Sequence, residues 1–260
     1  MSEGSSSRNQ LVVIDYLKAS AILLVLVGHS LLLAANYDNA TKSTINLIGD
    51  GGVFIFFFTS GFLATYTLKK PLNAKKYVFS RFSRIYPLYL IAVLISIPVV
   101  AEIQLGPKLL YPFMLQIFLK ENSGFLWYVP AIFGLFILFA AYHRSKPIFI
   151  ISLTLLIPYL LFIHRNKEIF CGVLFFVGVF IKRMPNVDIP KNIIVDKIAD
   201  ATYPLYLFQM FFLTLLLTIS NNVFLLFGVY LPAFVIATLL IQHFSPQVKI
   251  WLHHHNIEND

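Results

Sequence analysis

The chain has 260 residues, of which 58% are hydrophobic and 12% are charged, with a mean hydropathy of +0.77. Soluble domains carry about 25% charged residues, so this composition excludes an ordinary soluble domain and indicates an integral membrane protein. The net charge of +8 would by itself also suit a nucleic-acid partner, so the positions of the charges have to be considered. Cys171 is the one cysteine, which excludes a disulfide within the chain, and its apolar surroundings indicate a small buried side chain.

Hydrophobic stretches of about 20 residues predict an all-α bundle of about eight transmembrane helices. The first stretch is too long for a cleavable signal and is expected to remain as a membrane span. A weaker stretch at 109–119 is expected to be interfacial or re-entrant. Outside the membrane domain, 11–243, we expect a polar N-terminal leader at 1–10 and a C-terminal tail at 244–260. The predicted spans are 11–35, 48–68, 84–101, 125–142, 147–164, 168–182, 199–218 and 222–243.

The basic residues between these spans predict the orientation in the membrane. If the N-terminus is cytoplasmic, fourteen Lys and Arg residues fall in cytoplasmic segments and five in outer segments. This asymmetry is the one expected of cytoplasmic loops. We therefore expect a multi-pass protein of the cell membrane with both termini, and the tail, in the cytoplasm. The same distribution accounts for the positive charge without nucleic acid.

Three ionisable residues interrupt the first span, Leu11 to Ala35: Asp15, Lys18 and His29. A charge at the centre of a span costs roughly 2.5–3.5 kcal/mol even on the lenient insertion scale, so such groups tend to face the bundle interior. On a helix, Lys18 and His29 share one face about 16 Å apart, and Asp15 lies within ion-pair reach of Lys18. His29 can act as a general base, or it can be a structural histidine bonded to a neighbouring helix.

Two further positions carry polar groups with alternative interpretations. Arg81 and Arg84 share a helix face at the inner membrane surface, where they can bind lipid headgroups or a phosphorylated ligand. Spacing alone favours the lipid headgroups. Ser60 and Gly61 lie within an apolar helix, where Gly61 is expected to form a packing notch and Ser60 has no base beside it in sequence.

Taken together, these segments resemble the acyltransferase-3 family of integral-membrane O-acyltransferases. In the first span, the family pattern is a basic residue, ten further residues and a histidine, preceded by an aspartate. Lys18, His29 and Asp15 match this pattern, with Lys where Arg is commoner. It continues with 52–62, which contains Gly-Val, Phe-Phe and Ser-Gly-Phe, and with Arg-Phe-Ser-Arg-Ile-Tyr-Pro-Leu-Tyr at 81–89. Later segments that match are Leu-Trp-Tyr at 126–128 and Tyr-Pro-Leu-Tyr-Leu at 203–207.

Two features depart from the family pattern. Family members usually have about ten spans, whereas about eight are expected here. The late motif usually has a histidine two residues beyond its end, where this chain has Gln209. If that histidine aids catalysis in relatives, this chain lacks the aid.

The resemblance implies transfer of an acyl group, most often acetyl, from cytoplasmic acyl-CoA to a hydroxyl of a surface glycan or a lipid-linked sugar. Arg81 and Arg84 would hold the CoA phosphates, and His29 would be the general base. Lys18 would contact the phosphopantetheine region or stabilise developing negative charge, with Asp15 orienting it. No metal is required. The expected partners are the lipid bilayer, acyl-CoA and the glycan or lipid-linked acceptor.

Two other functions remain open at this point. A transporter or flippase would line its pathway with the same polar residues, but discontinuous helices and inverted repeats, which would support it, are not evident. A catalytically silent relative would keep the scaffold for a regulatory or partner-binding role, and Gln209 together with the small number of spans keeps that alternative open.

Overall fold

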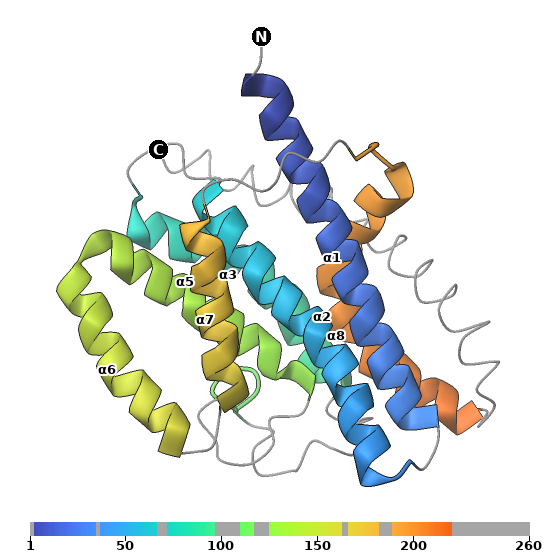
Figure 1. Ribbon diagram of the computed structural model, residues 1–260. Coiled ribbons are helices and arrows are strands. Elements are labelled where there is room, and N and C mark those ends of the chain that lie inside the picture. The colour runs from blue at the N-terminus through green and yellow to red at the C-terminus, as the bar shows by residue number, and fades with distance from the viewer. Residues whose placement is uncertain are drawn as a thin grey trace, which may run out of the picture.

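The computed structural model describes residues 3–34, 37–66, 72–96, 110–116, 125–162, 166–181 and 189–219. Within this part of the chain the fold is entirely helical, with seven α-helices, one 3₁₀ turn and no strand (Figure 1). The elements are α1 (Glu3–Ala34), α2 (Asn39–Tyr66), α3 (Ala74–Ser96), η2 (Phe125–Trp127), α5 (Tyr128–Arg144), α6 (Lys146–Phe162), α7 (Asn166–Phe180) and α8 (Ile193–Ile219).

Seven of the predicted spans each coincide with one of these helices, whereas the span predicted at 222–243 and the tail lie outside the described residues. Four of the helices are longer than the apolar stretches that predicted them, namely α1, α2, α3 and α8. Helix α1 takes in most of the polar leader, and α2 begins at Asn39 rather than at 48. Hydropathy marks the apolar part of a helix, while the hydrogen-bonded helix continues into polar flanking residues.

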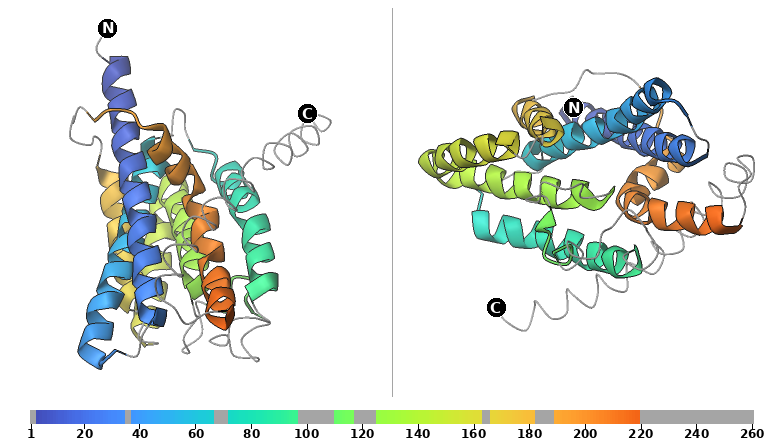
Figure 2. Two further views of the ribbon diagram at one scale, coloured as in Figure 1. Left: turned by 90° about the vertical axis from the view of Figure 1, so that its right-hand side faces the viewer. Right: turned by 90° about the horizontal axis from the view of Figure 1, so that it is seen from below.

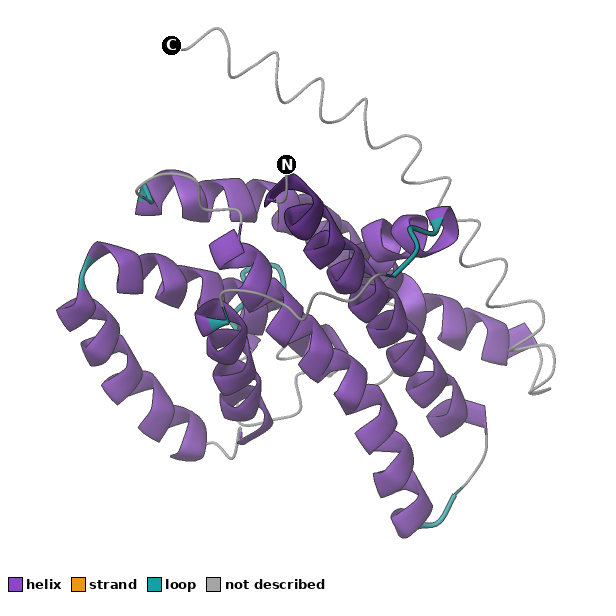
Figure 3. Cartoon of the chain, turned by 45° about the horizontal axis from the view of Figure 1, so that its top comes forward, coloured by secondary structure: helices purple, strands orange, loops and turns teal. Residues whose placement is uncertain are grey.

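Successive helices run in opposite directions through the bundle (Figures 1 and 2). Helix α2 packs between α1 and α7, α8 packs against α1 and α3, and α5 packs against α3 and α6. Figure 3 shows the same arrangement with helices and short connections distinguished by colour. The amino end of α1 and the carboxyl end of α2 therefore lie at one end of the bundle, which we call the N-terminal end.

Among the described residues, three helices are long and apolar enough to cross a membrane: Asn9–Leu32 within α1, all of α2 and all of α3. Helices α5 and α6 are apolar but shorter, with 17 residues each. Along α6 only Leu160 is buried, and large aliphatic side chains such as Ile150 and Leu155 are exposed. An outer surface of this kind is suited to contact with lipid, as the composition predicts.

Glycines bring α2 into unusually close contact with both of its neighbours. A Cβ on Gly52 would overlap the carbonyl oxygen of Ala21 in α1, and a Cβ on Gly61 would overlap that of Phe175 in α7. A Cβ on Gly178 of α7 would likewise overlap the carbonyl oxygen of Phe58 in α2. Small residues that let backbones approach are a usual means of packing membrane helices. The predicted packing notch at Gly61 is confirmed.

The segment expected to be interfacial or re-entrant contributes a buried turn. Of 109–119, residues 110–116 are described, and Tyr111, Met114 and Gln116 among them are buried. Buried Tyr89 of α3 donates a hydrogen bond to the carbonyl oxygen of Tyr111 (2.7 Å) and accepts one from Gln116 Nε2 (2.7 Å). The turn is therefore fixed against α3 by two buried hydrogen bonds, as irregular backbone within a membrane protein requires.

The glycine contacts predict the effect of adding one methyl group. Gly61→Ala forces the backbones of α2 and α7 apart, and overpacking of this kind costs about 1–3 kcal/mol. Gly51→Ala is the matched control on the same helix, because no atom lies within 4 Å of its added Cβ. Thermal unfolding in detergent should show a lower midpoint for Gly61→Ala and an equal or higher midpoint for Gly51→Ala. Equal midpoints for both variants would contradict the close packing.

The starts of α2 and α3 lie at opposite ends of the bundle and provide a test of the predicted orientation. In a Cys171→Ser background, we expect Lys75→Cys, at the exposed start of α3, to react with an impermeant maleimide only from the cytoplasmic face. Asn39→Cys, at the exposed start of α2, should react only from the outer face. Labelling of right-side-out and inverted vesicles measures both. The reverse pattern would invert the predicted topology.

Candidate active site

A cavity of about 300 Å³ lies among α1, α2, α3, α5 and α8, and three cationic side chains reach its wall. Lys18 comes from α1, while Arg81 and Arg84 come from α3. Thr59 and Ser60 of α2 and Asp200 and Thr202 of α8 also line it. The aromatic part consists of Phe56, Tyr128, Phe136, Tyr203 and Tyr206. We call this space the cationic cavity.

Aromatic rings position Arg81, and an ion pair positions Lys18. The Arg81 guanidinium lies 5.1 Å from the ring centroid of Tyr77 and 5.0 Å from that of Phe136. Such cation–π contacts are worth roughly 0.5–1 kcal/mol at exposed sites, and more when desolvated. Lys18 Nζ lies 3.1 Å from Asp15 Oδ1, which confirms the predicted ion pair. The two arginines do share one face, and the bundle turns that face toward the cavity.

The electrostatic character of the cavity suits an anionic ligand. Two carboxylates, of Asp15 and Asp200, stand against three cations, which leaves a positive balance at the wall. Guanidinium groups present two parallel donors that match phosphate oxygens, and a lysine adds a point charge. This placement favours a phosphorylated ligand for Arg81 and Arg84 over the lipid headgroups that spacing alone favours.

Three tyrosines line the cationic cavity, Tyr128, Tyr203 and Tyr206. The rings of Tyr128 and Tyr206 lie 4.8 Å apart, and Phe57 meets Tyr128 edge-on at 5.1 Å. The Tyr203 hydroxyl donates a hydrogen bond to the carbonyl oxygen of Ile85 (2.7 Å), which ties α8 to α3 across the cavity. Ser60 hydrogen-bonds the Tyr128 hydroxyl. No histidine is among the described residues of the lining, so a nucleophilic Ser60 gains no base here.

His29 belongs to a second cluster, farther along α1 toward the end of the bundle opposite the N-terminal end. The polar side chains that interact with its ring are those of Gln209, Lys167 and Asp50, from α8, α7 and α2. His29 Nδ1 is buried without a hydrogen-bond partner among the described residues. Gln209, at the position where the late motif was expected to have a histidine, is fully buried beside the ring.

Asp50 and Lys167 are joined by an ion pair between α2 and α7, and the Lys167 ammonium lies 4.8 Å from the Trp127 ring centroid. A backbone contact explains how Asp50 reaches the histidine: a Cβ on Gly28 would lie 2.9 Å from the Gly49 Cα. The residues that follow these two glycines, His29 and Asp50, are thereby held at the same level of the bundle. We call His29, Asp50, Lys167 and Gln209 the histidine cluster.

The structure thus divides the predicted site residues between two places. Lys18, Arg81 and Arg84 meet at the cationic cavity, with Asp15 beside Lys18. His29 lies about three helical turns from Lys18 and does not line that cavity.

Three charged residues of the cationic cavity and the histidine cluster were not predicted from the sequence. Asp50 carries a usable signal, since it is a carboxylate at the start of an apolar run, whereas Lys167 falls in a predicted outer loop. Asp200 stands at the edge of a predicted span. Across the described residues, no three His, Cys, Asp or Glu side chains gather as metal ligands.

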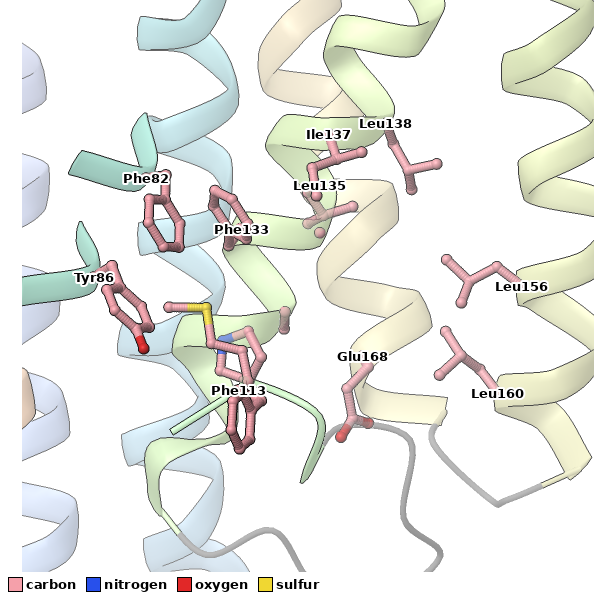
Figure 4. A pocket seen from close by; sticks show the side chains of 14 residues that line it. Phe82, Tyr86, Phe113, Phe133, Leu135, Ile137, Leu138, Leu156, Leu160 and Glu168 are labelled. Atoms are coloured by element: carbon pink, nitrogen blue, oxygen red, sulfur yellow. The ribbon is translucent and has the colours of Figure 1, made fainter. Parts of the chain in front are cut away.

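A second cavity, also of about 300 Å³, lies among α3, α5, α6 and the 110–116 turn (Figure 4). Its lining is almost wholly apolar, with Phe82, Phe133 and Leu156 among the side chains that face it. Glu168, at the start of α7, is the one charged residue of the lining. The cavity suits hydrocarbon.

Comparison with known proteins decides the family. The family model described as an acyltransferase domain matches residues 11–193, which is more than half of the chain. The chain belongs to the acyltransferase 3 family. No curated protein and no solved structure gives a significant match. The predicted resemblance to this family is confirmed. The matched residues include Lys18, Arg81, Arg84 and His29, whereas the motif at 203–207 lies beyond residue 193.

Proposed function

We propose that this protein is a membrane-bound O-acyltransferase. It moves an acyl group, in the simplest case acetyl, from cytoplasmic acyl-CoA to a hydroxyl of a surface glycan or lipid-linked sugar. The observation that carries the proposal is the convergence of Lys18, Arg81 and Arg84 on one cavity in a member of an acyltransferase family. A cavity with this charge fits the phosphates of an acyl-CoA donor better than it fits a neutral substrate.

The donor end of the reaction is assigned to the cationic cavity. Arg81 and Arg84 offer the forked donors that bind phosphate oxygens at two points, and the rings of Tyr77 and Phe136 hold Arg81 in place. Lys18 reaches the same cavity from α1, where it adds a third positive charge. Asp15 holds the Lys18 ammonium through the ion pair and so has a positioning role.

The acceptor end is assigned to the histidine cluster. His29 takes the proton from the acceptor hydroxyl as its oxygen attacks the thioester carbonyl, and the proton then passes to the departing CoA thiolate. Gln209 interacts with the imidazole and fixes the orientation of the ring.

Two short segments connect these ends, which supports a single path for the donor. Tyr128 lines the cationic cavity while its neighbour Trp127 contacts Lys167 in the histidine cluster. On α8, Tyr206 lines the cavity, and Gln209, three residues on, lies beside His29. The long, uncharged pantetheine arm of acyl-CoA would lie along these aromatic side chains, between the anion-binding site and the base.

Replacement of the arginines tests the donor assignment. Arg81→Gln with Arg84→Gln should raise the KM for acyl-CoA at least tenfold, since hydrogen bonds to charged groups are worth about 1.5–3 kcal/mol each. The matched control is Lys75→Gln with Lys76→Gln, which removes two exposed cations from the start of the same helix. Transfer from labelled acetyl-CoA in membranes measures both. If the lysine pair raised the KM equally, surface charge rather than the cavity would bind the donor.

Replacement of His29 tests the base. General base catalysis contributes typically 10²–10⁴-fold, so His29→Ala should lower the transfer rate by that factor while donor binding persists. His143→Ala, at the far end of α5, serves as the control. Full transfer by His29→Ala would refute the assignment and favour a catalytically silent scaffold or a different base.

A further inference from the structure

We propose that Lys167 is a further catalytic residue, whose ammonium stabilises the oxyanion formed when the acceptor hydroxyl attacks the thioester beside His29. The inference rests on the proposed function, and it assigns to Lys167 a role that the sequence pattern suggests for Lys18.

Geometry separates the two lysines. Lys18 lies about three turns, or roughly 16 Å, along α1 from His29 and is paired with Asp15. That distance excludes direct contact between its ammonium and a carbonyl oxygen that is reacting at His29. Lys167, in contrast, is close enough to the imidazole to interact with it electrostatically. Among the described residues, Lys167 supplies the positive charge of the histidine cluster.

The ammonium of Lys167 is held in position from two sides. Asp50 pairs with it from α2, and the Trp127 ring lies 4.8 Å from it on η2. The contact between Gly28 and Gly49 sets Asp50 and His29 at one level, so the charge is fixed relative to the base. Groups oriented before the reaction stabilise a developing charge without paying for reorganisation during it.

The cluster is reachable by a substrate. The Lys167 side chain is 37% exposed and that of Asp50 is 30% exposed, whereas Gln209 behind the histidine is fully buried. Glu168, the next residue, lines the apolar second cavity instead (Figure 4). Of the two adjacent charges at the start of α7, Lys167 is therefore the one directed toward the reacting groups.

A purely structural ion pair between α2 and α7 is the competing explanation. These helices already interlock at Gly61 with Phe175 and at Gly178 with Phe58, so they do not depend on a charge pair for their contact. A partly exposed ion pair such as this one contributes little net stability, about 0–1 kcal/mol, because solvent screens the attraction. Ionisable residues that are nevertheless kept within a membrane bundle usually mark a functional pathway.

The reaction step balances with the groups named. The acceptor oxygen forms a bond to the thioester carbon while His29 accepts the hydroxyl proton, and the carbonyl oxygen becomes an oxyanion bonded to the Lys167 ammonium. Collapse of this intermediate restores the carbonyl and breaks the carbon–sulfur bond. The CoA thiolate leaves and takes the proton from protonated His29, so Lys167 ends the step unchanged.

The first test replaces the charge and separates rate from binding. Loss of one oxyanion donor typically lowers kcat by 10²–10³-fold, so Lys167→Met should do so with the KM for acetyl-CoA within about threefold of normal. Lys167→Arg should keep part of the rate. Lys42→Gln, which removes a lysine from the first turns of α2 at the same end of the bundle, should leave kcat unchanged.

A charge swap separates catalysis from structure. The double variant Asp50→Lys, Lys167→Asp keeps an ion pair between α2 and α7 but moves the ammonium to the other helix. We expect it to recover the thermal midpoint of the unmodified protein in detergent without recovering kcat. Recovery of both would make the pair structural and overturn the inference.

A third variant provides a test that does not depend on whether Lys167→Met folds. Lys167→Cys in a Cys171→Ser background, treated after purification with 2-bromoethylamine, regains an ammonium at nearly the same position. Its kcat should rise at least tenfold on treatment, and no rise would overturn the inference. If Lys167→Met is fully active while His29→Ala is inactive, only the role of Lys167 fails. If His29→Ala is fully active, the proposed function itself fails.

Discussion

The close approach of α2 to α1 on one side and to α7 on the other is the contact on which the arrangement of polar groups depends. At Gly52 and Gly61 the backbone of a neighbouring helix occupies the space that a side chain would need. Without a hydrophobic driving force between helices in lipid, such backbone contact is a main source of packing energy. It also fixes the register: Gly28 against Gly49 brings His29 level with Asp50, and α7 then presents Lys167 to the same carboxylate.

Much of this bundle could be predicted from hydropathy, because the spans and the helices arise from the same apolar runs. The Lys18–Asp15 pair could also be predicted, since both residues lie on one helix at a spacing of three. The contacts between helices could not be predicted in this way. Spacing places Arg81 and Arg84 on one face, but only the packing of α3 against α5 and α8 determines whether that face meets lipid or a cavity.

Lys167 and Asp50 show why hydropathy alone did not predict the histidine cluster. Lys167 lies beyond the apolar run of its span and was assigned to a loop, yet α7 begins at Asn166 and holds the side chain in its first turn. Asp50 stands three residues into the predicted second span, but α2 begins at Asn39, so Asp50 lies well inside the helix. Helix ends extend beyond the hydrophobic pattern, and charges at those ends become interior groups when the neighbouring helices are long.

The division into a cationic cavity and a histidine cluster also gives Gln209 a specific meaning. An amide at this position donates and accepts hydrogen bonds but does not titrate, so it can orient the imidazole without exchanging protons with it. A histidine at the same place would share the proton with His29 and would compete with it as base. In the proposed mechanism Gln209 therefore preserves the geometry of the site and leaves proton transfer to His29 alone. Activity in this chain then requires that one histidine together with the nearby cation, rather than a pair of histidines.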